Sequence, residues 1–497
     1  MSRRDWEAPT EPPARDAQEH GCAAGAASFP PRLNSADNNG GKEARQLRHG
    51  ALKFPSVLVQ GVTHIAPAVG LVLSLQYITL NAGAATPLAF AVAFCVVLTL
   101  GISLTQLARN HPSAGGYYTY ISCTLHPRAG FLTAWIYFLY DPTSTAINLA
   151  FMGFFLQNAC RTEFGVIFPW WVFFVPAVAV VTAMVYRGIE ISAKAMGWLT
   201  AVEVAILVTL STLGALHPGA GAAHSAATAA KTTVSGGGFY LAVVFAVFSF
   251  TGFESVAPLA EEAEHPRRNL PRSIVYSIVL TGIFFTVCSW GILRGWGIAQ
   301  TGEFARSQEN PVLILARHLL GGAWMLVVLA VFNSIMAASI ACTTASTRVF
   351  FAMGRQGALP RGLAKIHPRF QTPMNAIWLQ TAITLGLGLG MGFWIGPDQE
   401  YYFLGVAMTL GLILVYTAGN LGVFLDYWLR RRQEYRPVLH LAIPLLSTVL
   451  LFWAGCRSIV PLPEAPVRYA PILAAVWILM GVAITFSRWG ATGEPIR

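Results

Sequence analysis

Charged residues are scarce in this chain. Only 11% of its 497 residues are Asp, Glu, Lys or Arg, whereas 55% are hydrophobic and the mean hydropathy is +0.54. A soluble protein of this size carries about a quarter charged residues. Apolar runs of about 20 residues recur from Leu52 onward, and each is long enough to cross a hydrocarbon core of about 30 Å. The sequence therefore predicts an all-α polytopic membrane protein and excludes a soluble globular domain.

Several motifs of other protein classes are also missing. The apolar runs contain no H-E-x-x-H, no G-x-S-x-G and no paired His and Asp motif, which disfavours a membrane enzyme. The seven cysteines form no C-x-x-C pair, so we interpret them as small apolar side chains rather than a disulfide framework or a metal site. We expect no metal and no cofactor. The net charge of +10 comes from residues between the apolar runs and does not indicate nucleic acid.

The hydropathy pattern divides the chain into three parts. Residues 1–50 are rich in Ala, Pro, Asn, Gly and charge and lack the apolar core of a signal peptide, so we expect a disordered cytoplasmic tail. Ten predicted spans fill residues 51–432, and two more, with a short C-terminal tail, fill residues 433–497. Only seven of the 33 Lys and Arg residues fall in the connections that such a topology places outside. Both termini are therefore expected on the cytoplasmic side of the plasma membrane.

The first and the sixth predicted spans contain helix-breaking sequence at membrane depth. In the first, Pro67 follows Ile65 and Ala66 and lacks a backbone N–H. In the sixth, residues 249–254 read Ser-Phe-Thr-Gly-Phe-Glu, which places a carboxylate beside a glycine. Irregular backbone at this depth is tolerated only where it lines a cavity or is buried in protein. Broken first and sixth helices indicate an inverted repeat of five plus five helices with a substrate site between the breaks.

Two acidic side chains near the middle of the membrane each allow two interpretations. Glu254 is either a cap for free backbone N–H groups at the sixth break or a proton carrier or gate. Asp141, in the third predicted span, either bonds locally to Thr143 or Thr145 or binds a substrate amine or a proton. Both interpretations stay open for each residue at this point.

Other polar groups in the predicted spans also allow more than one interpretation. Glu203, in the fifth predicted span, either pairs with Lys194 or an arginine of an inner loop, or takes part in proton coupling. His64, beside the first break, is either a neutral structural histidine or a proton-coupling one. Sodium coupling also stays open, since the eighth predicted span offers candidate oxygen ligands at Ser339, Thr343, Thr344, Ser346 and Thr347.

Three segments resemble the amino acid–polyamine–organocation family of permeases. They are PSAGGYYTYISCTLHPRAGF at 112–131, FSFTGFESVAPLAEEAEHPRRNLPRSI at 248–274 and STRVFFAMGRQGALPRGLAKIHPRFQTPMNA at 346–376. The resemblance covers about Leu52 to Leu429. It implies a fold like that of the bacterial leucine transporter and secondary transport of an amino acid or a small amine by alternating access.

The resemblance also bears on individual residues. Ile65, Ala66 and Pro67 stand where similar amino acid permeases carry a Gly-Ser-Gly type run that binds the substrate carboxylate, and proline removes one of those donors. Glu203 stands where cationic amino acid transporter-like members have a lysine that replaces sodium. Glu254 matches an acidic position that relatives retain, and Phe248 matches a gating aromatic of arginine–agmatine antiporter-like members.

Together these observations predict a substrate site and a set of coupling residues. The substrate site comprises Ile65, Ala66, Pro67, Ala68, Asp141, Phe248, Ser249, Thr251 and Gly252. Proton coupling or gating is assigned to Glu254, Glu203 and Phe250.

Charge predicts the kind of substrate. Asp141 and Glu254 both lie near the midplane, whereas no Lys or Arg falls in the central part of the first, third, sixth or eighth span. A bound cation offsets the desolvation of such acids. We therefore expect an amine or a cationic or neutral amino acid as substrate, with proton coupling or exchange. The alternative is a transporter-like sensor that binds the same molecule without turnover. The sequence does not indicate an oligomeric state.

Overall fold

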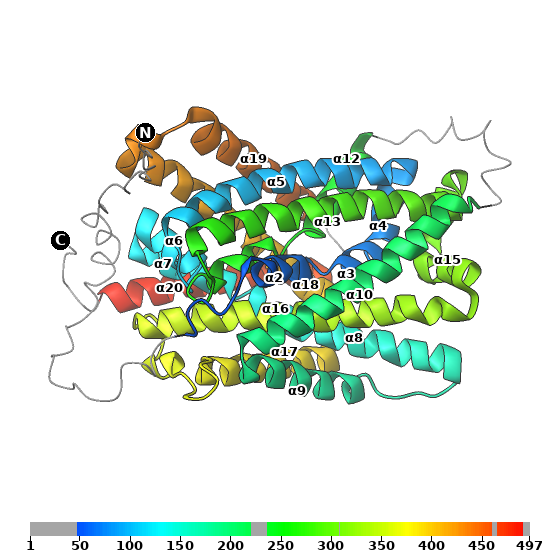
Figure 1. Ribbon diagram of the computed structural model, residues 1–497, viewed down its shortest axis with the longest axis horizontal. Helices are drawn as coiled ribbons and strands as arrows, with labels where there is room; N and C mark the ends of the chain where they lie inside the picture. Colours follow the sequence, from blue (N-terminus) through cyan, green and yellow to red (C-terminus); the bar gives the residue numbers. More distant parts are fainter. Residues whose placement is uncertain (1–46, 220–235, 308, 460–464, 491–497) are drawn as a thin grey trace, which may run out of the picture.

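Most of the long helices lie side by side along one common direction (Figure 1). The computed structural model describes residues 47–219, 236–307, 309–459 and 465–490. Within these residues the regular structure is helical, apart from two isolated bridges between Leu52 and Ala263 and between Ile366 and Pro373. The all-α prediction is therefore confirmed for the described part of the chain.

The described residues form the following helices. In the first half they are α2 (Phe54–Ile65), α3 (Pro67–Val72), α4 (Leu75–Ala82), α5 (Thr86–Asn110), α6 (Tyr117–Thr124), α7 (Pro127–Tyr137), α8 (Asp141–Phe164), α9 (Trp171–Arg187) and α10 (Ile189–Leu216). In the second half they are α12 (Gly236–Phe248), the 3-10 helix η4 (Phe253–Leu259), α13 (Pro266–Trp296), α14 (Thr301–Arg306), α15 (Pro311–Leu320), α16 (Met325–Arg355), η7 (Arg361–Ala364), α17 (Met374–Ile395), α18 (Pro397–Leu425), α19 (Ile443–Ile459) and α20 (Ala470–Gly490).

Nine helical stretches of the described residues are long and apolar enough to cross a membrane. They are Phe54–Val72, Leu75–Asn110, Ile189–Leu216, Gly238–Leu259, Pro266–Trp296, Pro311–Arg355, Met374–Ile395, Pro397–Arg430 and Val467–Ser487. Two shorter apolar helices, Trp171–Arg187 and Val438–Trp453, add to them. This pattern fits a polytopic membrane protein. Twelve crossings, the five-plus-five repeat and the three-part division of the chain stay predictions.

The first span is broken where the sequence predicts it. Helix α2 ends at Ile65, Ala66 takes a left-handed conformation with φ 56° and ψ 69°, and α3 begins at Pro67. The break follows from Pro67, whose ring disfavours a helical conformation at the preceding residue. Proline is tolerated in the first turn of the next helix, where its missing N–H has no intrahelical acceptor.

The sixth span is broken as well. Helix α12 ends at Phe248, and Gly252 has a φ of 119° that L side chains rarely adopt. A Cβ added to Gly252 would lie 2.8 Å from the carbonyl carbon of His64. Glycine is therefore needed twice here, for the backbone conformation and for the close approach of the two breaks.

A third break was not predicted. The sequence suggested one continuous third span with Asp141 inside it, but α7 ends at Tyr137 and α8 begins at Asp141. Pro142 occupies the first turn of α8, a position that suits proline. Asp141 consequently lies at the start of a helix, where a carboxylate is favoured by the helix dipole.

The broken helices are enclosed by continuous ones. Helix α2 packs against α10, α13, α16 and η4, and α8 packs against α16, α17 and α18. From Asn333 to Gly354 every residue of α16 is buried, so this helix crosses the interior of the bundle. The three breaks therefore meet inside protein, as irregular backbone at membrane depth requires.

Candidate functional site

A buried polar cluster lies where the three breaks approach one another. Its members come from α2, from the end of α7, the start of α8 and the turn between them, and from α16. They are His64, Tyr137, Tyr140, Asp141 and Cys342, and each is less than a tenth exposed. Buried His, Tyr and Asp side chains normally have hydrogen-bond partners, so their contacts with one another are informative.

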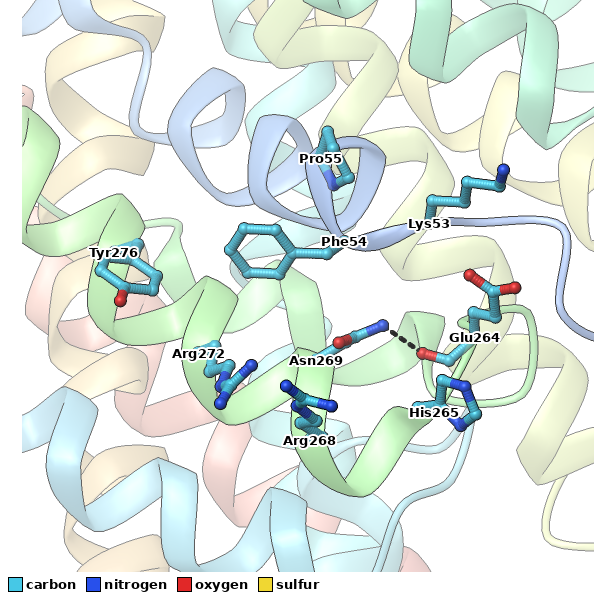
Figure 2. A pocket seen from close by; sticks show the side chains of 9 residues that line it. All are labelled: Lys53, Phe54, Pro55, Glu264, His265, Arg268, Asn269, Arg272 and Tyr276. Atoms are coloured by element: carbon cyan, nitrogen blue, oxygen red, sulfur yellow. Dashed lines mark hydrogen bonds between the residues drawn. The ribbon is translucent and has the colours of Figure 1, made fainter.

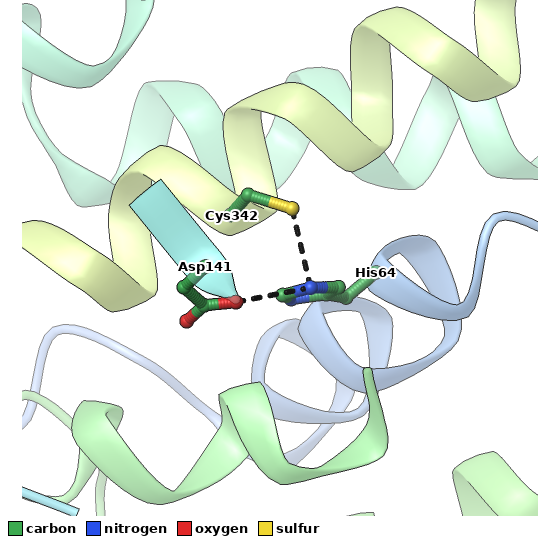
Figure 3. A group of neighbouring side chains, drawn as sticks. All are labelled: His64, Asp141 and Cys342. Carbon is green, nitrogen blue, oxygen red and sulfur yellow. Dashed lines mark hydrogen bonds and ion pairs between the residues drawn. The ribbon is translucent and has the colours of Figure 1, made fainter. Parts of the chain in front are cut away.

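The ring nitrogen Nε2 of His64 is the centre of this cluster (Figure 3). It lies 3.3 Å from Oδ1 of Asp141, 3.2 Å from Sγ of Cys342 and 3.4 Å from the hydroxyl of Tyr140. The hydroxyl of Tyr137 donates to Oδ2 of Asp141 at 2.5 Å. A neutral imidazole nitrogen is either a donor or an acceptor, so one nitrogen does not satisfy all three neighbours.

Part of the hydrogen-bonding capacity of the cluster is unused. Within the described residues, Oδ1 of Asp141 and Nδ1 of His64 have no hydrogen-bond partner. The distance of 3.3 Å from Nε2 to Oδ1 is an ion-pair distance without hydrogen-bond geometry. A buried acceptor of this kind is costly to leave unpaired, and it is suited to a donor from a ligand.

The same donor atoms are able to hold a metal ion. Ligand atoms of His64, Asp141 and Cys342 all lie within 4.8 Å of one another, and imidazole, carboxylate and thiolate are all zinc ligands. The interpretation of all cysteines as apolar side chains is thus wrong at Cys342, whose sulfur contacts His64. Nothing in the sequence near Cys342 distinguishes it from the other small residues of its helix.

Glu254 lies at the sixth break beside this cluster. Its Oε2 accepts a hydrogen bond from the backbone N–H of Gly252 at 3.1 Å, and its Oε1 has no partner in the described part of the chain. The side chain is 1% exposed. This contact matches the interpretation of Glu254 as a backbone cap, and it leaves one oxygen free for a proton.

The comparison with known families decides the class of protein. Residues 56–475 match the family described as amino acid permease. The chain belongs to this family. It is therefore a multi-pass membrane transporter and not an enzyme, and the resemblance drawn from the three sequence segments is confirmed.

Three relatives with differently named substrates are similar to this permease. The low-affinity putrescine importer PlaP of Escherichia coli (strain K12) is 26% identical, over 70% of this chain and 75% of its own. The branched-chain amino acid permease BcaP of Bacillus subtilis (strain 168) is 24% identical, over 62% and 68%. The serine/threonine exchanger SteT of the same organism is 23% identical, over 68% and 74%.

The other residues predicted for the substrate site lie at the two breaks of the permease. Ile65 and Ala68 are buried on either side of Ala66 and Pro67. The hydroxyls of Ser249 and Thr251 donate to the carbonyls of Phe245 and Phe248, so both hydroxyls cap the end of α12. Phe248 itself is partly exposed. Phe250 is fully buried and packs edge-to-face on Phe285 of α13, with ring centroids 5.0 Å apart.

Glu203 is separate from the cluster. It is 1% exposed on α10, and among the described residues neither of its oxygens has a hydrogen-bond partner or an ion-pair partner. Lys194 is exposed, so the suggested pair between these two residues does not form. One turn before Glu203, the hydroxyl of Thr200 bonds to that of Thr63 on α2 at 2.7 Å. This contact ties the fifth span to the first.

Three of the five hydroxyl groups considered as sodium ligands form hydrogen bonds within the protein. Thr343 bonds to Thr145 of α8 at 3.2 Å, and Ser346 donates to Gln380 of α17 at 2.9 Å. The hydroxyl of Thr347 donates to the carbonyl of Thr343. Ser339 and Thr344 have hydroxyls without a partner in the described residues. These contacts join α16 to the third and ninth spans.

A buried ion pair at one end of the bundle was missed by the sequence analysis. Arg348 of α16 donates from Nε and Nη2 to the two carboxylate oxygens of Glu262, at 2.9 and 3.2 Å, and both side chains are at most 1% exposed. The backbone around Glu262 pairs with the segment before α2, because Leu52 donates to the carbonyl of Glu262 and Glu264 donates to that of Leu52. This contact seals the start of the first span against the loop that follows the sixth.

Proposed function

We propose that this permease is a secondary active transporter that carries a small amine, or an amino acid held by its amino group, across the membrane by alternating access. The observation that supports this most strongly is the free Oδ1 of Asp141. It belongs to a fully buried carboxylate, and within the described residues the one Lys or Arg that is buried, Arg348, is engaged with Glu262. A substrate ammonium group offsets the desolvation of such a carboxylate.

The surroundings of Asp141 suit an ammonium group in further ways. An ammonium has three donors and no acceptor, and it finds acceptors in Oδ1 of Asp141 and in a neutral His64. The rings of Tyr137 and Tyr140 lie in the same cluster, with centroids 5.9 Å apart, and aromatic faces attract cations. The names of the three relatives, a putrescine importer, a branched-chain amino acid permease and a serine/threonine exchanger, all refer to molecules with an amino group.

The first break favours an amine over a substrate that depends on its carboxylate. Pro67 occupies the first turn of α3 and removes one backbone donor from it. Fewer backbone N–H groups are thus available to a carboxylate. Acidic amino acids, whose second carboxylate would also face Asp141 and Glu254, are expected to be excluded.

The contact between the breaks supports a coupled movement. Gly252 touches His64, so a displacement of the first break changes the environment of the sixth, where Glu254 holds the Gly252 N–H. Protonation of Glu254 weakens it as an acceptor. We therefore propose proton coupling or exchange through Glu254, in a twelve-span, five-plus-five fold. The permease is assigned to the plasma membrane with both termini cytoplasmic, because the Lys and Arg residues concentrate in the connections on that side.

Counterflow in sealed vesicles separates the transporter from the sensor. Purified protein is reconstituted into separate batches of liposomes, each loaded with one unlabelled compound (putrescine, leucine, serine or glutamate), and the entry of the same compound in labelled form is followed. A transporter accumulates at least one labelled amine or neutral amino acid transiently above its equilibrium level. Saturable binding of the same compounds to purified protein without any accumulation would instead establish the sensor.

A further inference from the structure

A basic cleft opens between the start of α2 and the first turns of α13 (Figure 2). Its volume is about 480 Å³. The residues that line it are Lys53, Phe54, Pro55, Glu264, His265, Arg268, Asn269, Arg272 and Tyr276. The amide of Asn269 donates to the carbonyl of Glu264 and so fixes the turn that forms the floor of the cleft.

The charge of the cleft is unbalanced. Lys53, Arg268 and Arg272 contribute three cations, and Glu264 is the one carboxylate in the lining. Among the described residues none of the three cations forms an ion pair. Arg268 and Arg272 are one helical turn apart on the same face of α13. The cleft therefore attracts an anion with several acceptor oxygens, such as a phosphate group.

The position of the cleft along α13 corresponds to the membrane surface. Residues 273–293 contain no charged side chain and rise about 31 Å at 1.5 Å per residue, which matches the hydrocarbon thickness. Arg272 stands immediately before this run. Tyr276 lies one turn further, at the depth where aromatic side chains gather at membrane interfaces.

An exposed apolar stripe continues from the cleft along the same helix face. Tyr276, Leu280, Ile283 and Val287 follow one another at spacings of three or four residues, and each is about half exposed. The spacing from Arg268 through Arg272 to Tyr276 is the same. One face of α13 thus presents first two arginines, then an aromatic ring, and then an aliphatic surface.

We propose that the cleft binds one anionic phospholipid. The phosphate lies among Lys53, Arg268 and Arg272, the glycerol region lies against Phe54 and Tyr276, whose ring centroids are 6.0 Å apart, and an acyl chain follows the stripe on α13. A free phosphate ion satisfies the same cations but leaves the stripe uncovered. The geometry therefore favours a lipid over a soluble anion.

The bound lipid adds a contact between two elements that already pack against each other. Lys53 precedes α2 directly, and the neighbouring Leu52 exchanges backbone hydrogen bonds with Glu262 and Glu264. A headgroup that contacts both Lys53 and the arginines of α13 holds this sealed end together. The binding itself does not depend on the proposed substrate, so it is measured without transport.

Lipid retention on the purified protein tests the proposal. Protein is equilibrated in detergent with equal amounts of phosphatidylglycerol and phosphatidylcholine, and the retained lipids are measured by native mass spectrometry. Wild type is expected to retain phosphatidylglycerol preferentially. Arg268→Gln with Arg272→Gln should retain about thirtyfold less, from the attraction that each of the two basic residues contributes near an anionic lipid. Arg268→Lys with Arg272→Lys should retain most of it.

The matched control removes two charges elsewhere. Arg361→Gln with Lys365→Gln changes exposed residues at η7 outside the cleft and should retain lipid like wild type. If the glutamine pair in the cleft does not fold, Arg272→Gln alone is used, with a smaller loss expected. Equal retention by cleft and control variants would overturn the proposal. Displacement of phosphatidylglycerol by millimolar inorganic phosphate would also overturn it, in favour of a soluble anion site.

Discussion

At the scale of single residues, the site is defined by polar atoms that the protein leaves unsatisfied. Oδ1 of Asp141, Nδ1 of His64 and Oε1 of Glu254 are all buried and have no hydrogen-bond partner among the described residues. Buried polar atoms are nearly always paired, so each of these three atoms needs a partner, and a ligand or a proton at the breaks would supply one. The two acids differ in their hydrogen-bond donors, since Glu254 accepts from the backbone N–H of Gly252 and Asp141 accepts from the hydroxyl of Tyr137.

The role of Glu254 is tested by replacing its carboxyl group with an amide. Glu254→Gln keeps an oxygen for the Gly252 N–H and keeps the volume, so the fold should be retained. It does not exchange a proton, so uptake should lose its dependence on pH between 5 and 8. Initial uptake rates in vesicles across this range provide the measurement.

A second buried carboxylate serves as the control for that experiment. Glu400 of α18 is fully buried with two unpartnered oxygens in the described structure, but it belongs to none of the three breaks. Glu400→Gln is expected to keep the wild-type pH profile. The proton role of Glu254 is refuted if its amide variant transports at the wild-type rate with an unchanged profile.

At the scale of elements, the contact between the first and sixth breaks depends on one glycine. Gly252→Ala places a Cβ 2.8 Å from the His64 carbonyl carbon, at a φ that alanine rarely adopts. Backbone strain of this kind costs about 1–3 kcal/mol, and the breaks must separate to relieve it. We expect uptake to fall about fivefold or more, since 1.4 kcal/mol corresponds to a factor of ten.

A glycine in open space is the matched control for this substitution. Gly386 of α17 has no heavy atom within 4 Å of an added Cβ and lies inside a regular helix. Gly386→Ala should leave uptake unchanged and should stabilise the helix by about 0.5–1 kcal/mol. Comparable losses in both variants would show that the contact between the breaks is not special.

The contribution of the buried ion pair between Glu262 and Arg348 to stability is tested by removing its negative charge. Glu262→Gln leaves Arg348 as a buried charge without a counter-ion, which costs about 3–5 kcal/mol. Thermal unfolding in detergent should therefore occur at a markedly lower temperature. Glu190→Gln breaks the exposed pair with Arg48 and should cost less than about 1 kcal/mol. A melting temperature equally insensitive to both substitutions would contradict a structural role for the buried pair.

At the scale of the whole molecule, the membrane class and two of the three helix breaks were predictable from the sequence, because each follows from composition or from a single residue. Scarce charge and long apolar runs specify a membrane protein, and Pro67 and Gly252 restrict the backbone wherever they occur. The break before Asp141 was missed because Asp-Pro begins a new helix as readily as it makes a local turn. Proline is compatible with both.

The partners within the site were beyond sequence reasoning for a different physical reason. A surface helix shows by its polar and apolar faces which side points inward, but α16 is buried on all sides from Asn333 to Gly354. The sequence of α16 therefore does not predict that Cys342 faces His64 or that Arg348 reaches Glu262. These contacts depend on how separate spans are arranged, which a single sequence does not specify.

The central claim of this account is that Asp141 binds the amino group of the substrate. Equilibrium binding of putrescine, leucine and glutamate to purified wild type and Asp141→Asn, by isothermal titration calorimetry, tests it most directly. Glu303→Gln, which changes an exposed acid on α14, is the control. The account predicts that putrescine or leucine binds, that glutamate does not, and that Asp141→Asn weakens binding by about 1.4 kcal/mol or more, a tenfold change in Kd. Unchanged affinity in Asp141→Asn, or glutamate as the preferred ligand, would contradict it.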